Sequence, residues 1–148
     1  VRTVTGVDSS AGMLAGLAAK TTAQGLTNVS WRHLDLEAGG ALDGRYHLVA
    51  CSMALHHVRD VAALLAAWRA VLVPGGHLCV ADLDAEDGSF HADMTGIHHH
   101  GFDRASLGVQ LVVAGFSAVT ITSASDVERP GEGGAIRRFP VFLAHARG

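Results

Sequence analysis

Short apolar runs alternate with helix-like segments along most of the chain. Apolar and β-branched runs predict six strands, over residues 3–8, 28–33, 46–52, 77–83, 117–125 and 138–146. Apolar positions at helical spacing, with Ser or Asp near the starts, predict three helices, over residues 11–24, 60–71 and 103–114. Strands that alternate with helices in this way predict an α/β fold, a doubly wound and mostly parallel sheet with helices on both faces.

The pattern changes near the end of the chain. The last two predicted strands are separated only by a loop over 126–134, which is too short for a crossover helix, so the final strand should run antiparallel to its neighbour. Pro74-Gly75-Gly76 predicts a turn, and 84–101 predicts a long polar loop. The near-continuous apolar run at 46–52 predicts a fully buried strand. No linker or repeat is visible, so residues 1–148 are expected to form one domain.

Composition narrows the class of protein. Apolar residues make up 49% of the chain and charged residues 17%, which suits a folded core. The formal net charge is -3 with no basic run, which argues against a nucleic-acid partner. The sequence shows no membrane-span or signal-peptide pattern. Cys51 and Cys79 lie inside predicted strands, which is typical of reduced cysteines in the core. We therefore expect a cytoplasmic protein without a membrane partner. Because Val1 is not an initiator Met, we interpret the chain as a fragment or a processed product.

Candidate binding residues follow the predicted parallel strands. Ligands of such sheets bind beyond the carboxyl ends of the strands, where the sequence has Asp8, Asp35, Ser52 and Asp82. Asp8 is suited to accept hydrogen bonds from both ribose hydroxyls of an adenosine. Asp35 is placed to accept from an adenine amino group, with the Leu36 backbone at a ring nitrogen and Met13 beside the base. The alternative is that the Asp and Ser residues serve only turns and caps, and that Met13 is core.

Histidines are the second unusual feature. Six of the ten lie in two predicted loops: His56, His57, His91, His98, His99 and His100. A histidine titrates near neutral pH, so His56 and His57 are weak candidates for a catalytic base. The run at 98–100 is not terminal, which excludes a purification tag, and consecutive residues ligate a metal awkwardly, so no metal is expected. We expect these loops to line a substrate pocket or form a lid; the alternative is a solvated loop packing on the helix that starts at Asp103.

Several of these stretches together resemble class I S-adenosylmethionine-dependent methyltransferases of the small-molecule type. GVDSSAGML resembles the family's second strand and the helix start that follows, and HLDLE resembles its adenine-contacting motif. LVACSMALHHV resembles the fourth strand and the loop over the methionine moiety. VLVPGGHLCVADL resembles the fifth-strand motif, and HGFDRASLGVQLVVAGF resembles a late helix and the turn into strand six.

The resemblance implies a Rossmann-like sheet with strand order 3-2-1-4-5-7-6 and methyl transfer from S-adenosyl-L-methionine to a small-molecule acceptor by in-line displacement. It implies that no metal is required. By position, Asp8 with Ser9 would hold the ribose, Asp35 and Leu36 the adenine, and Ser52 the methionine portion, with Met13 near the base. The acceptor side would be formed by His57, Asp82, His98, His99 and His100, together with His56.

The chain departs from the family at its start, because the first strand, the Gly-rich loop and the first helix are absent. We therefore expect an N-terminally truncated domain whose methyl transfer is impaired. Without the first strand, the centre of the sheet would have a gap. We expect the strands at 3–8 and 46–52 to pair directly and close it. The alternatives are a homodimer or strand donor that completes the sheet, or a chain of low stability. Alternative functions are a catalytically inactive nucleotide-binding or interaction module, and an NAD-type domain, which Pro74-Gly75-Gly76 and the terminal hairpin disfavour.

Overall fold

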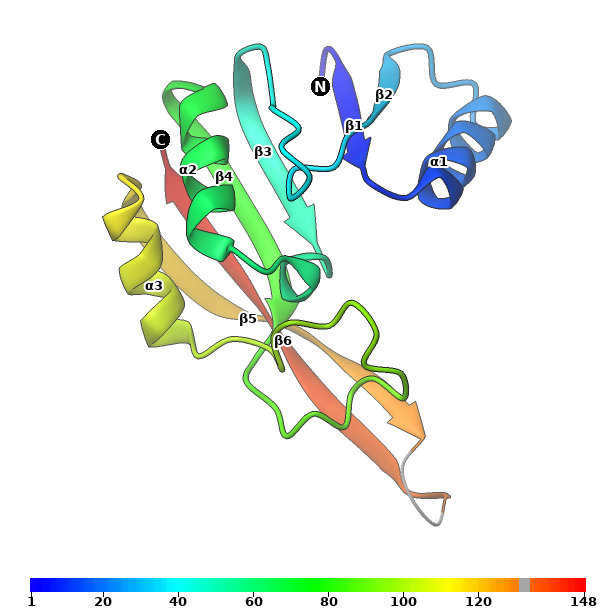
Figure 1. Ribbon diagram of the computed structural model, residues 1–148, viewed down its shortest axis with the longest axis vertical. Helices are drawn as coiled ribbons and strands as arrows, with labels where there is room; N and C mark the ends of the chain where they lie inside the picture. Colours follow the sequence, from blue (N-terminus) through cyan, green and yellow to red (C-terminus); the bar gives the residue numbers. More distant parts are fainter. Residues whose placement is uncertain (131–133) are drawn as a thin grey trace. The chain divides into compact units, whose positions relative to one another are not determined.

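The computed structural model describes residues 1–130 and 134–148, and the chain divides into two compact units, Val1–Ala41 and Leu42–Gly148. Each unit contains its own sheet. The first has strand order β1-β2 and the second β3-β4-β6-β5 (Figure 1). The expectation of one domain over 1–148 stays a prediction. No described helix has the length and apolar character needed to cross a membrane.

The first unit is a single βαβ element. Strand β1 (Val4–Asp8) pairs in parallel with β2 (Val29–His33), which places Asp8 opposite His33. Helix α1 (Ala11–Ala23) connects them and starts at Ser10, whose Oγ accepts a hydrogen bond from the Met13 amide at 3.3 Å. A Cβ at Gly6 would lie 2.5 Å from Leu17 Cδ2, so a larger residue here would force the Leu17 side chain of the helix to move.

The second unit contains the remaining elements: β3 (Tyr46–Ser52), η1 (Leu55–His57), α2 (Val61–Val71), β4 (Leu72–Leu83), α3 (Arg104–Val113), β5 (Ser117–Pro130) and β6 (Ile136–Arg147). β3 and β4 are parallel, whereas β6 runs antiparallel to both β4 and β5. The antiparallel final strand is thereby confirmed. Helices α2 and α3 lie on the same side of this sheet (Figure 1).

The core of the second unit lies between the sheet and these two helices. Alternate residues of β4, Leu78 and Val80, are buried, as are Leu65 and Trp68 of α2 and Leu107 of α3. The opposite face of the sheet is more open: Leu48 on β3 is 49% exposed. The prediction of a fully buried strand at 46–52 is therefore wrong, because within this unit helices cover only one face.

The predicted start of the strand at 77–83 is also wrong. Strand β4 begins at Leu72 rather than His77, and Pro74-Gly75-Gly76 forms an irregularity where the register with β3 shifts between Tyr46 and Leu48. Gly148 stabilises that irregularity, because its carbonyl accepts from the Gly75 amide at 3.0 Å and its amide donates to the Gly76 carbonyl at 2.8 Å.

The predicted loop at 126–134 is mostly strand. β5 continues to Pro130, because residues 126–130 keep pairing with β6, and Arg138 Nε contacts Glu128 Oε1 across the ladder at 3.0 Å. Residues 131–133 of that predicted loop lie outside the described residues. Cross-strand pairing of this kind depends on a partner strand, which local turn propensity does not register.

The expected direct pairing of the strands at 3–8 and 46–52 is wrong for the described strands. β1 is hydrogen-bonded to β2, and β3 is hydrogen-bonded to β4. Each strand takes its partner from its own unit, so the two ladders remain separate sheets.

Candidate functional site

The parallel pairing of β1 and β2 brings two predicted carboxylates to one edge of the first unit. Asp8 ends β1, and its carbonyl accepts from the Leu34 amide at 3.0 Å, so the segment carrying Asp35 leaves the sheet beside Asp8. Asp8 is half-buried and Asp35 is exposed. Their Oδ1 atoms accept local backbone hydrogen bonds, Asp8 from Ser10 at 2.7 Å and Asp35 from Glu37 at 2.9 Å. Both carboxylates keep oxygen lone pairs for further donors.

The other cofactor candidates of the first unit lie near the same edge. The Ser9 carbonyl is 2.9 Å from His33 Nε2, which ties the loop after β1 to the end of β2. Met13 lies in the first turn of α1 and is 66% exposed, so its interpretation as a core residue is wrong. Leu36 is half-buried. The first unit therefore presents an exposed apolar side chain, Met13, on the helix that follows Asp8.

At the carboxyl ends of β3 and β4, the second unit has a buried carboxylate, Asp82, with no exposed surface. Its Oδ2 accepts from the Leu55 amide at 2.8 Å and the His56 amide at 3.3 Å. Its Oδ1 lies 2.6 Å from His56 Nδ1 and accepts from the Leu83 amide at 2.8 Å. Because a carboxylate oxygen accepts, His56 Nδ1 carries the proton and donates. Asp82 thus holds η1 and one histidine ring in place.

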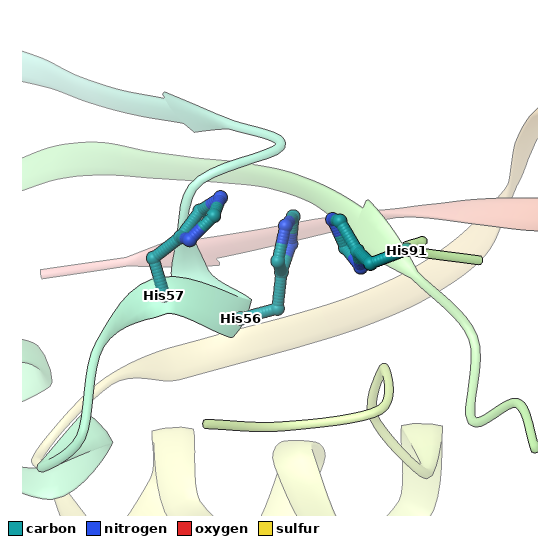
Figure 2. A group of neighbouring side chains, drawn as sticks. All are labelled: His56, His57 and His91. Atoms are coloured by element: carbon teal, nitrogen blue, oxygen red, sulfur yellow. The ribbon is translucent and has the colours of Figure 1, made fainter. Parts of the chain in front are cut away.

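Three histidines meet above this carboxylate. Their rings lie side by side, with His57 and His91 approaching His56 from opposite sides; His56 and His57 come from η1 and His91 from the loop after β4 (Figure 2). The ring centroid of His56 lies 4.3 Å from that of His57 and 4.9 Å from that of His91. The three rings border a pocket of about 320 Å³, whose other lining residues are Met53, Phe90, Val127 and Arg129.

The loop over 84–101 is fastened to η1 by backbone contacts. The amides of His98 and His99 both donate to the His56 carbonyl, at 3.0 and 3.2 Å. His57 Nδ1 lies 3.0 Å from the Gly96 carbonyl, which only accepts, so this nitrogen also donates. Phe90, next to His91, is buried in a small cluster with three other residues, Leu83, Phe139 and Val141. The arrangement of the three rings is therefore set by packing and hydrogen bonds on both sides.

The predicted run His98, His99 and His100 has a different role from the three-histidine cluster. None of the three is among the described residues that line the pocket. His99 Nε2 lies 2.9 Å from the Val58 carbonyl, and His100 Nδ1 is 3.6 Å from Glu86 Oε1. His98 is exposed. Ser52, at the end of β3, is also exposed, whereas Asp82 is enclosed by protein donors.

Two titratable groups in or near the pocket are shifted toward their neutral forms. Partial burial lowers the pKa of His91, and the neighbouring His56 and His57 lower it further. On β3, burial raises the pKa of the Cys51 thiol to about 12, and the Asp82 charge acts in the same direction. Cys51 and Cys79 are both free, as expected, and Cys51 stays protonated at neutral pH, which makes it a poor nucleophile.

Sequence reasoning missed part of this site. His91 was grouped with the loop histidines, but nothing in its spacing indicates that it meets His56 and His57. The sequence predicts a loop at Val127 and Arg129, whereas the extension of β5 carries both residues to the pocket. Met53 adopts φ 51°, a left-handed conformation that L-residues seldom adopt, directly before η1. Such a backbone conformation leaves no clear signal in the sequence.

Comparison with known proteins identifies the family. A model of the "methyltransferase domain" matches residues 1–76 of the chain. The chain belongs to this methyltransferase-domain family. An uncharacterized methyltransferase of Schizosaccharomyces pombe is 33% identical over a segment that covers 45% of this chain and 27% of the yeast protein. The match thus spans about a quarter of that relative's length.

Solved structures agree on the fold. An S-adenosylmethionine-dependent methyltransferase from Mesorhizobium loti matches with a TM-score of 0.67 at 21% identity, covering 100% of this chain and 81% of that one. Phosphoethanolamine N-methyltransferase 2 from Haemonchus contortus, solved with S-adenosyl-L-methionine, matches with a TM-score of 0.73 at 12% identity, covering 97% and 42%. The chain has the Rossmann-like α/β fold of methyltransferases, with a mostly parallel arrangement and an antiparallel last strand.

Proposed function

We propose that the protein transfers a methyl group from S-adenosyl-L-methionine to a small-molecule acceptor. The observation that carries this proposal is the placement of Asp8 and Asp35 at adjoining ends of two parallel strands in a member of the methyltransferase family. Carboxylates at such positions suit a ribose and an adenine amino group, because both present N–H or O–H donors. The fit is supported by the exposed Met13 on the same unit, an apolar surface for a base.

The residues have separate proposed roles. Asp8 and Ser9 hold the ribose, Asp35 and the Leu36 backbone hold the adenine, and Ser52 contacts the methionine portion. The bound cofactor supplies a methyl group already activated by its sulfonium. The protein then acts mainly by positioning the acceptor for in-line attack.

The pocket of the second unit is the proposed acceptor side. It combines apolar walls, Met53 and Val127, with imidazole rings and the Arg129 guanidinium, which suits a small acceptor that carries a polar or anionic group. His57 contributes to this wall, while Asp82 acts through His56 as a positioning residue. His98 and His99 support this wall through their amide hydrogen bonds to the His56 carbonyl, and His100 follows them in the same loop.

Calorimetry with S-adenosylhomocysteine tests the cofactor assignment. A charged hydrogen bond contributes about 1.5–3 kcal/mol before solvent screening, so Asp8→Ala should weaken binding by about tenfold or more. Asp93→Ala is a matched control, because Asp93 Oδ1 accepts from the amide two residues ahead, Thr95, at 2.9 Å, as Asp8 does from Ser10. Equal affinities for the wild type and Asp8→Ala would contradict the assignment. Binding without methyl transfer to any tested acceptor would favour the inactive module.

A further inference from the structure

We propose that His56, His57 and His91 bind one divalent transition-metal ion of the zinc type, each through one ring nitrogen. Candidate ligand nitrogens of the three rings all lie within 4.8 Å of one another. The rings converge from η1 and from the loop after β4, with no backbone segment between them (Figure 2). The sequence led us to expect no metal, and this proposal replaces that expectation; it does not depend on the proposed methyl transfer.

The hydrogen bonds of two rings select the nitrogen that faces the metal. His56 Nδ1 donates to Asp82 at 2.6 Å, and His57 Nδ1 donates to the Gly96 carbonyl at 3.0 Å. When each ring binds a metal in its neutral form, the lone pair is on Nε2, which is therefore the nitrogen that would face the metal. A carboxylate or carbonyl behind each ligating histidine is the usual outer contact of protein zinc sites, where it fixes the tautomer and the ring orientation.

The geometry requires a small closure rather than a rearrangement. Zn–N bonds of 2.0–2.1 Å in a tetrahedral site place ligand nitrogens about 3.4 Å apart. The candidate nitrogens, now within 4.8 Å of one another, must therefore approach more closely, and the exposed His57 and half-buried His91 have more room to move than His56. His56 is 2% exposed and held by Asp82, so it serves as the fixed ligand.

The donor set indicates which ion fits. Three imidazoles suit zinc, cobalt, nickel or copper, whereas magnesium and calcium require oxygen ligands. Three protein ligands leave one coordination position for water or another small ligand. Arg129 also lines the pocket, stacked on Phe90 with its Cζ 4.6 Å from the ring centroid, and its charge favours an anionic fourth ligand.

Metal uptake by the tag-free protein tests the proposal. The protein is treated with a chelator, dialysed into phosphate-free buffer and equilibrated with Zn²⁺, and bound metal is measured by mass spectrometry. We expect one tightly held equivalent per chain. Co²⁺ in place of Zn²⁺ should give the intense visible absorption bands of a tetrahedral site.

Three variants make the test specific. His91→Ala and His57→Ala should each weaken Zn²⁺ binding at least about tenfold. His47→Ala is the matched control, an exposed histidine of β3 that lies outside the pocket lining, and it should bind Zn²⁺ like the wild type. Circular dichroism confirms that each variant folds; His56→Ala is avoided because that ring is buried.

Clear outcomes would overturn the proposal. These are the absence of Zn²⁺ uptake by the folded wild type, equal Zn²⁺ affinity in His91→Ala and wild type, or the same loss of Zn²⁺ affinity in His47→Ala as in His91→Ala. Binding of inorganic phosphate without Zn²⁺ uptake would identify the pocket as an anion site instead. S-adenosylhomocysteine calorimetry with Asp8→Ala tests a residue of the first unit, whereas Zn²⁺ uptake tests the histidines of the second, so failure of the metal site and failure of the proposed function are distinguishable.

Discussion

His56 Nδ1 and Asp82 Oδ1 lie 2.6 Å apart, and their side chains are only 2% and 0% exposed. The same carboxylate also accepts the amides of Leu55, His56 and Leu83. One buried side chain at the end of β4 therefore anchors the short helix that follows β3. The anchored helix presents His56 and His57 to the pocket, so the placement of the site depends directly on this contact.

Asp82→Ala should lower the free energy of unfolding by about 3–5 kcal/mol, because removing one partner leaves buried donors without an acceptor. Urea denaturation monitored by circular dichroism measures the change. Asp93→Ala, on the exposed part of the loop, should cost less than about 1 kcal/mol. A loss of similar size in the two variants would show that Asp82 does not anchor η1.

Asp103 should make part of the stability depend on acidic pH. Hydrogen bonds from the Ser106 backbone and hydroxyl lower the pKa of this N-cap carboxyl below its usual 3.8. Since the folded-state pKa is depressed, the stabilisation is present above the unfolded-state pKa and disappears as the pH falls through the folded-state value.

The comparison of wild type with Asp103→Asn isolates this contribution. Asparagine also caps helices but does not titrate, so the stability difference between the two proteins should be constant near neutral pH and shrink below about pH 4. Denaturation curves across that range measure it. A difference that grows as the pH falls would contradict the assignment.

Cys51 should react slowly with iodoacetamide in the folded protein. Its thiol pKa of about 12 leaves far less thiolate at pH 8 than an ordinary cysteine has. We expect alkylation at Cys51 to be at least about tenfold slower in native buffer than in urea, measured by peptide mass spectrometry. Similar rates in the two conditions would show that the strand does not shield the thiol.

Local sequence signals were sufficient for the regular elements. Ser10, Asp60 and Asp103 begin the three helices by accepting amide hydrogen bonds, an interaction that depends on residues only three positions apart. The apolar run at 46–52 predicted both ends of β3 correctly. Parallel pairing of the first two strands, and with it the common edge for Asp8 and Asp35, followed from the alternation of strand and helix.

Long-range pairing and burial were not predictable in this way. The continuation of β5 to Pro130 depends on β6 as its partner, and the exposure of Leu48 depends on which sheet face the helices cover. The sequence showed a surplus of histidines, and it indicated the consecutive run at 98–100 as part of the acceptor side. It gave no sign that His91 meets His56 and His57.

By itself, then, the sequence determined the element types, the family resemblance and the strand-end carboxylates, because each rests on neighbours a few residues apart. Only the tertiary structure decided that His56 and His57 meet His91. That meeting requires Asp82 to hold η1, Phe90 to bury beside His91, and the loop amides to reach the His56 carbonyl. Those contacts join residues far apart in the chain, so no local pattern of side chains specifies them.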